Sequence, residues 1–233
     1  MARPRTSLRI LAPDLWVGEG PQRFMGLEVG SRMTVLRLSD GSLLVHATRA
    51  LEPELRVQLA ALGPVRYALA PNRFHHLYAR DVALHYPRAR LWIAEGVQHK
   101  RPDLAYDAIL TDRAPDEWQG QVDQAYFRGR PMENEVVFLH RASRTLILCD
   151  LAMNFGPDAP LLTRAVMSVV GGQGRFRPTR LDPLLIRDRI AARASLEHIL
   201  SWDFDRVVLS HGEVLETGGK AALREGYGWL RKN

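Results

Sequence analysis

Side chains of the kinds that bind metal ions stand where apolar runs of the chain end. They are His75 and His76 after the run 65–70, Asp150 at the end of the run 145–150, and His211 after the run 206–209. Apolar, β-branched runs of this length predict buried strands. The ends of such strands meet at one crevice in open α/β sheets, and imidazole and carboxylate groups suit zinc, iron or manganese. The spacing therefore predicts one metal-binding or catalytic cluster.

The segments that must position these residues alternate between strand and helix patterns. An Asp40-Gly41 turn between alternating runs predicts a hairpin of strands at 33–38 and 42–47. Pro53 at a tolerated first-turn position and a Gly63-Pro64 stop frame a helix at 53–62. The other predicted strands are 15–17, 65–70, 90–94, 108–110, 124–127, 135–140, 145–150 and 207–210, and the other predicted helices are 76–86, 182–200 and 220–231.

The stretch from Asn154 to Arg180 is rich in Pro and Gly around an apolar segment at 161–170. Within it, the glycine-rich run 171–175 predicts a flexible loop or a lid. The same residues are more typical of a plain linker, which is the favoured interpretation.

Composition predicts one domain covering residues 1–233, because 46% hydrophobic residues can form one sizeable core. The net charge of +6 comes from 32 Lys+Arg against 26 Asp+Glu spread along the chain, which is typical of a solvated surface rather than of nucleic-acid binding. No run is long enough to span a bilayer. We expect a cytoplasmic protein without a nucleic-acid or membrane partner. The single Cys149 excludes an internal disulfide.

These segments resemble the metallo-β-lactamase-fold superfamily, whose motifs run His-x-His-x-Asp-His, then a mid-chain His, a bridging Asp and a late His-Gly. Laid on these motifs, Pro71 and Arg73 stand at the first two His, His75 at the Asp, His76 at the last His, Asp150 at the bridging Asp and His211 at the late His. No His stands at the mid-chain position near 130–135. Pro-Asn-x-x-His-His and Asn-Glu-Val-Val-Phe are similar to a bacterial branch of the superfamily, domain of unknown function 4336.

The resemblance implies an α/β (α+β) fold, a four-layer αβ/βα sandwich of metallo-β-lactamase type with two facing mixed sheets and helices outside. Strands followed by helices, repeated in the two halves of the chain, fit this arrangement. The same periodicity also fits an open three-layer α/β fold.

The resemblance also implies a reduced metal site. The residues that would hold a divalent transition metal, zinc first and iron or manganese as alternatives, are His75, His76, Asp150 and His211. Pro71 and Arg73 replace ligands of the first metal, so we expect at most one metal per chain. Four ligands around tetrahedral zinc would make the site structural, since catalysis needs an open position.

Two residues receive catalytic roles in this interpretation. Asp150 would orient or deprotonate a water molecule, and Arg73 would stabilise substrate charge. A salt bridge from Arg73 to Glu133 or Glu135 is an equal alternative. Either acid could also be a metal ligand or a general base, although solvated loop acids are commoner. His46, at the end of a hairpin strand, is a candidate hydrogen-bond donor to the site or a structural residue.

The sequence favours a metal-dependent hydrolase of a small-molecule ester, lactone, thioester or phosphoester. The alternative is a non-enzymatic descendant of the fold, in which the His and Asp side chains form only a hydrogen-bond network and the pocket binds a small ligand or a protein. Metal content separates the two hypotheses. Redox chemistry at iron is disfavoured because it normally requires the full two-metal set.

Overall fold

Two mixed β-sheets face each other in the computed structural model, which describes residues 7–231. The larger sheet contains, in spatial order, β1 (Arg9–Ala12), β2 (Leu15–Gly20), β5 (Ser31–Arg37), β6 (Leu43–His46), β7 (Val65–Ala70), β8 (Arg90–Ile93) and β9 (Ala108–Ile109). The smaller sheet contains β10 (Val122–Tyr126), β11 (Val136–His140), β12 (Thr145–Ile147) and β13 (Arg206–Val208). A separate hairpin pairs β3 (Arg23–Phe24) with β4 (Leu27–Glu28).

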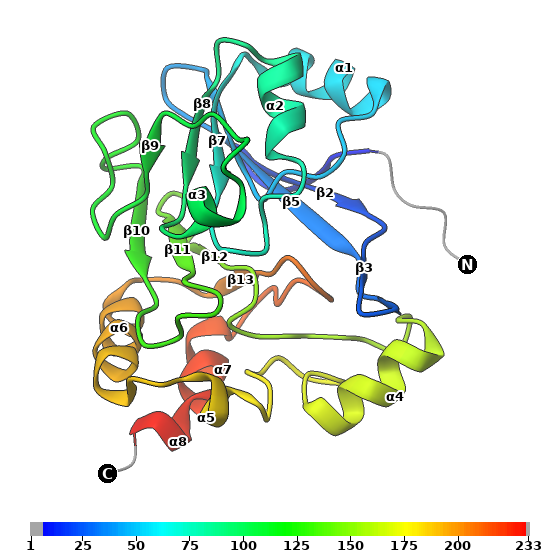
Figure 1. Ribbon diagram of the computed structural model, residues 1–233, viewed down its shortest axis with the longest axis vertical. Helices are drawn as coiled ribbons and strands as arrows, with labels where there is room; N and C mark the ends of the chain where they lie inside the picture. Colours follow the sequence, from blue (N-terminus) through cyan, green and yellow to red (C-terminus); the bar gives the residue numbers. More distant parts are fainter. Residues whose placement is uncertain (1–6, 232–233) are drawn as a thin grey trace.

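Helices cover the outer sides of both sheets (Figure 1). Those beside the larger sheet are α1 (Pro53–Leu62), α2 (Ala79–His85) and α3 (Val97–Lys100). Those of the second half are α4 (Leu161–Val170), α5 (Asp182–Leu185), α6 (Arg189–Ser201), α7 (Gly219–Gly226) and α8 (Gly228–Arg231). The predicted four-layer arrangement is thus confirmed, and the open three-layer alternative is wrong. None of the helices in residues 7–231 is long and apolar enough to cross a membrane.

The side chains of the smaller sheet alternate between its two faces, and each face contributes to a separate hydrophobic core. Phe138 of β11 points into the core between the sheets, whereas its neighbours Val137 and Leu139 pack with the outer helices. Side chains of successive strand residues point to opposite faces, so one strand supplies both cores. Each of the three side chains is at most 4% exposed. Their burial fixes which residues of β11 face the larger sheet.

Parallel pairing of β12 with β13 aligns the segments that carry two of the predicted site residues. Ile147 is paired with Val208, and the amide of Leu148 donates to the carbonyl of Val208 at 3.0 Å. Asp150 and His211 therefore leave the same edge of the sheet three residues beyond this pair.

The loop after β7 connects the larger sheet to the smaller one. The amide of Val136 donates to the carbonyl of Pro71, and the amide of Arg73 donates to the carbonyl of Glu133, both at 2.8 Å. These bonds place the loop that carries His75 against the start of β11. The site thus forms where the two sheets meet.

Several element boundaries differ from the predictions for local reasons. The helix expected from 76 begins only at Ala79, because Asn72 Oδ1 accepts from the amides of Phe74 and His75 and holds the preceding residues in turns. The helix expected over 182–200 is broken between α5 and α6. There Asp188 Oδ1 caps α6 by accepting from the amide of Ala191 at 2.9 Å.

The first prediction concerns the packing between the sheets. Phe138 is 1% exposed and its ring meets that of His46 edge-to-face at 5.3 Å. Phe138→Ala should lower the free energy of unfolding by about 3–5 kcal/mol, because the cavity cannot collapse between two sheets. Val57→Ala, at a side chain that is 70% exposed on α1, should change it by less than about 0.5 kcal/mol. Urea denaturation measures both, and similar losses would contradict the two-sheet core.

Candidate metal centre

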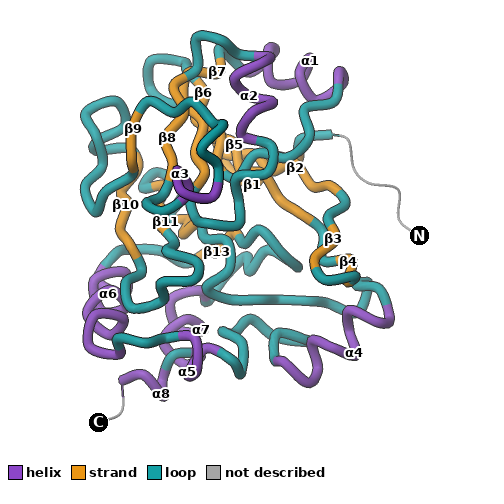
Figure 2. The backbone as a smooth tube through the Cα atoms, in the orientation of Figure 1, coloured by secondary structure: helices purple, strands orange, loops and turns teal. Residues whose placement is uncertain are grey.

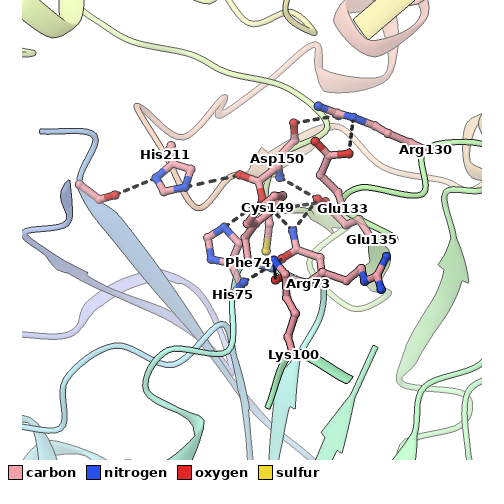
Figure 3. A network of polar contacts seen from close by, with 12 residues as sticks. Arg73, Phe74, His75, Lys100, Arg130, Glu133, Glu135, Cys149, Asp150 and His211 are labelled. Carbon is pink, nitrogen blue, oxygen red and sulfur yellow. Dashed lines mark hydrogen bonds and ion pairs between the residues drawn. The ribbon is translucent and has the colours of Figure 1, made fainter. Parts of the chain in front are cut away.

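His75, Asp150 and His211 form one cluster at the meeting point of the sheets (Figure 3). His75 Nε2 lies 3.2 Å from Asp150 Oδ2, and His211 Nε2 lies 3.5 Å from Asp150 Oδ1. One potential ligand atom from each residue lies within 4.8 Å of the others. The side chains are 12–13% exposed, so solvent reaches the cluster. Three residues that lie far apart in the sequence thus offer an accessible set of imidazole and carboxylate ligands.

The protonation of His211 follows from its hydrogen bond to the main chain. Its Nδ1 lies 2.7 Å from the carbonyl oxygen of Gly30, which can only accept, so Nδ1 carries the proton. Burial lowers the pKa of His211 despite the opposing charge of Asp150, which favours the neutral ring. Nε2 of the neutral ring then presents a lone pair to a carboxylate oxygen. A cation between these two acceptors would stabilise both, so the donor set fits a metal ion.

Arg32 holds the backbone on both sides of His211. This side chain of β5 is 6% exposed, and it donates to the carbonyls of Leu209 at 2.5 Å and Gly212 at 2.6 Å. Its charge is balanced by Glu19 at 2.9 Å. The larger sheet therefore fixes both the ring and the backbone of His211.

Asn72 connects Asp150 to the turn that carries His75. Its Nδ2 donates to Asp150 Oδ2 at 2.7 Å and to Glu135 Oε2 at 3.1 Å. Its Oδ1 accepts from the amides of Phe74 at 2.9 Å and His75 at 2.8 Å. The side chain is fully buried, and all its polar capacity is used to position the cluster.

Glu135 is buried beneath the end of β12. Its carboxylate accepts from the amides of Cys149 at 2.7 Å and Asp150 at 2.8 Å, as well as from Asn72. Burial and the nearby charge of Asp150 raise the pKa of Glu135 to about 7. Glu135 therefore positions Asp150 and is not the solvated loop acid that the sequence suggested.

Charge within the cluster is set by Asp150. Burial would raise the pKa of Asp150, but His75, His211 and Asn72 hold it well below its usual range. Burial would likewise lower the pKa of His75, but the Asp150 carboxylate outweighs this effect and raises it. Both shifts favour an ion pair between protonated His75 and ionised Asp150.

His76 does not join this cluster. The group of potential ligands contains His75, Asp150 and His211 but not His76. His76 is 8% exposed, and its Nδ1 has no hydrogen-bond partner among the residues that the structure describes. Lys100 and Arg101 lie near enough to lower its pKa together with burial, and Arg101 donates to its carbonyl at 3.5 Å. The turn held by Asn72 directs His75, and not its neighbour, toward Asp150. The predicted set of four is therefore reduced to three in this structure.

Arg73 also lies apart from the predicted position. Figure 3 shows its guanidinium directed away from the cluster. It donates to the carbonyl of Pro131 at 2.8 Å and packs against Gly96. Its expected salt bridge to Glu133 or Glu135 does not form, since Glu133 pairs with Arg130 at 2.9 Å. The geometry gives no support to a role for Arg73 in stabilising substrate charge.

His46 is buried next to the cluster without any polar partner. It is 1% exposed, and neither ring nitrogen forms a hydrogen bond within the described residues. Burial, with a smaller contribution from His75, lowers the pKa of His46 to about 3. Its ring packs on Phe138, so it is a neutral core residue in this structure.

Sequence reasoning missed the residues that support the cluster. Asn72 carried a signal, because an Asn after Pro in a turn often bonds the amides that follow it. Arg32 carried none, since an alternating strand gives no reason to expect a buried cation bound 177 residues away.

Comparisons with solved structures define the fold. A metallo-β-lactamase from Pontibacter korlensis is similar with a TM-score of 0.66 at 12% identity, over 97% of this chain and 99% of that chain. FIM-1 from Pseudomonas aeruginosa, a metallo-β-lactamase in its mono-zinc form, has a TM-score of 0.60 at 12% identity, over 96% and 92%. The Flv1 flavodiiron core from Synechocystis sp. PCC6803 has a TM-score of 0.68 at 10% identity, over 97% of this chain and 60% of that chain. The chain thus has a metallo-β-lactamase fold.

The family is defined by sequence. The profile of the family described as Domain of unknown function (DUF4336) matches residues 13–174, and the chain belongs to that family. No curated protein matches the sequence. The predicted resemblance is confirmed at both levels.

The second prediction concerns Asn72. Asn72→Ala should lower the free energy of unfolding by at least about 2 kcal/mol, because it leaves buried donors and acceptors unpaired. Asn154→Ala is the matched control. Its side chain forms one bond, to the carbonyl of Glu213 at 3.0 Å, and its loss should cost about 1 kcal/mol. Equal losses in denaturant titrations would show that Asn72 does not hold the site.

Proposed function

We propose that this protein is a metal-dependent hydrolase with one divalent transition metal held by His75, Asp150 and His211. The observation that carries the proposal is that Nε2 of His211 faces a carboxylate oxygen of Asp150 at 3.5 Å while its Nδ1 is bonded to the carbonyl of Gly30. Zinc suits two imidazoles and a carboxylate, and iron and manganese are the alternatives.

The residues in the rest of the site support the proposal of a single metal. Pro71 cannot bind a cation through its side chain, and Arg73 is itself cationic and directed away. Asn72 and Glu135 fill the neighbouring space. The carboxylate of Glu135 already accepts hydrogen bonds from the side chain of Asn72 and from the backbone amides of Cys149 and Asp150. Within residues 7–231, no second group of three potential ligands lies beside Asp150.

Three protein ligands support a catalytic rather than a structural site. With His76 outside the cluster, a tetrahedral ion keeps a fourth position for water or substrate. A divalent metal bound there would act as a Lewis acid and lower the pKa of a water molecule. Asp150 would orient that water through the carboxylate that Asn72 and Glu135 hold in place, and His75 would release its proton when the metal binds. The substrate class is an ester, lactone, thioester or phosphoester.

One observation favours the alternative of a non-enzymatic binding protein. The ion pair between His75 and Asp150 and the bonds from Asn72 satisfy the carboxylate without any metal. A network of this kind could persist as the remnant of a lost metal site. Metal content decides between the two functions.

The third prediction is the metal stoichiometry. Elemental analysis of purified, dialysed protein should find about one equivalent of transition metal per chain, with zinc as the main element. Asp150→Asn should reduce the content by about tenfold or more, because an amide is a poor ligand for zinc. Two tightly held equivalents would contradict the mononuclear site, and none in protein reconstituted with zinc would favour the non-enzymatic alternative.

The fourth prediction uses pH and a chelator. A metal stabilises the folded state that binds it, and the imidazoles must be neutral to coordinate. The raised pKa of His75 means that protons compete with the metal as the pH falls. A chelator should therefore lower the melting temperature more at pH 8 than at pH 5.5.

Variants assign this effect to residues. His75→Ala and His211→Ala should abolish the chelator effect, whereas His76→Ala and the exposed control His198→Ala should retain it. Loss of the chelator effect in His76→Ala would instead support the original hypothesis that His76 is a fourth ligand. A chelator effect that is larger at pH 5.5 would exclude imidazole ligands.

A further inference from the structure

The helix α4 exposes an apolar stripe. Leu161, Ala165 and Val169 follow one another at intervals of four residues, which places them on one face of a helix, and Leu162 adjoins that face. Leu161 is 80%, Leu162 64% and Val169 71% exposed. A surface helix normally turns its apolar face to the core, so this exposure requires an explanation.

The inner side of α4 is formed by the half-buried side chains of Val166, Met167 and Val170 and by one buried threonine. Thr163, its only buried residue, donates through Oγ1 to the carbonyl of Glu28 in β4 at 2.9 Å. Figures 1 and 2 show α4 at the periphery of the molecule, next to the hairpin of β3 and β4. The tip of that hairpin adds Phe24 at 54% and Met25 at 87% exposure. Helix and hairpin are neighbours, and their exposed apolar residues are here called the α4 platform.

Arginines without acidic partners accompany the platform. They are Arg164, Arg175, Arg177 and Arg180. None of them forms an ion pair in the described part of the chain, whereas Arg9, Arg32, Arg37 and Arg90 of the larger sheet each pair with a nearby acid. Arg180 donates to the carbonyl of Val169 at 3.1 Å, which ties the group to the end of α4. The platform therefore combines exposed apolar side chains with uncompensated positive charge.

This combination selects among possible partners. A second copy of the chain would bring like charges together across a two-fold axis. Nucleic acid would leave the apolar stripe without a function, because it is bound mainly through its phosphates. An anionic lipid surface satisfies both features, since acyl chains accept the apolar face while headgroups pair with arginine.

We propose that the α4 platform binds the surface of anionic membranes, with α4 lying in the interface. The expectation of no membrane partner rested on the lack of a spanning segment, which does not bear on surface binding. Phe24 contacts Phe74 with ring centroids 6.2 Å apart, and Phe74 precedes His75, so the platform borders the candidate metal centre. Binding to lipid needs no metal, and it is testable whether or not the proposed hydrolase activity is found.

Vesicle co-sedimentation tests the proposal on the full chain, with and without chelator. Vesicles of phosphatidylcholine and phosphatidylglycerol should bind at least about tenfold more tightly than phosphatidylcholine alone, and added salt should weaken binding. Leu162→Ser with Val169→Ser, and separately Arg164→Gln with Arg175→Gln and Arg177→Gln, should each weaken binding about tenfold or more.

Matched controls carry the same changes elsewhere on the surface. Val57→Ser with Ile190→Ser alters side chains that are 70% and 85% exposed, and Arg66→Gln with Arg88→Gln and Arg113→Gln removes equal charge. The apolar control should bind within about twofold of the wild type, and the charge control should lose less than the arginine variant. Equal losses in control and test variants would overturn the proposal.

A fluorescent reporter places the contact at α4. Measured against the wild type, which contains five Trp residues, Leu162→Trp should add emission that shifts to the blue on anionic vesicles and is quenched by brominated acyl chains. No binding to anionic vesicles would overturn the proposal. If the wild type is a dimer and Leu162→Ser with Val169→Ser dissociates it, the proposal is overturned, and the occupant of the platform is a second copy of the chain.

Discussion

A 2.7 Å hydrogen bond joins Nδ1 of His211 to the carbonyl oxygen of Gly30, and the chemistry of the site depends on it. It fixes the tautomer of a buried imidazole and turns the other nitrogen toward Asp150. The bond comes from the larger sheet, while His211 follows the last strand of the smaller sheet. The same segment supplies Arg32, which holds the carbonyls on both sides of His211. Association of the two sheets and formation of the site are therefore one event.

The opposite side of the site is held in a similar way by Asn72 and Glu135. Asn72 bonds the carboxylate of Asp150 and the turn of His75, and Glu135 bonds the backbone at Asp150. Polar groups that are buried and fully paired hold a single arrangement, because each alternative leaves one of them unpaired. The cluster is thus pre-organised before any ion binds.

The sequence was sufficient for most of the strands and for bringing together three of the four residues proposed as ligands. Apolar runs that end at His75, Asp150 and His211 predicted both the strands and the edge at which the side chains meet. It was not sufficient for the choice between His75 and His76, since that depends on the hydrogen bonds of Asn72 within a turn. Nor did it give the role of Glu135, which the sequence offered only as a ligand, a base or a loop acid, because the partners of this carboxylate are mainly backbone amides, which every residue but proline offers. The exposure of the apolar face of α4 could not be predicted from the sequence either, since apolar residues at helical spacing predict a buried face.

X-ray absorption spectroscopy of protein loaded with zinc is the most direct measurement of the proposed ligand set. The account predicts scattering from two imidazoles and at least one carboxylate oxygen, with a spectrum that His76→Ala leaves unchanged. Loss of one imidazole contribution in His76→Ala would contradict the three-residue site, as would a zinc ion surrounded only by water.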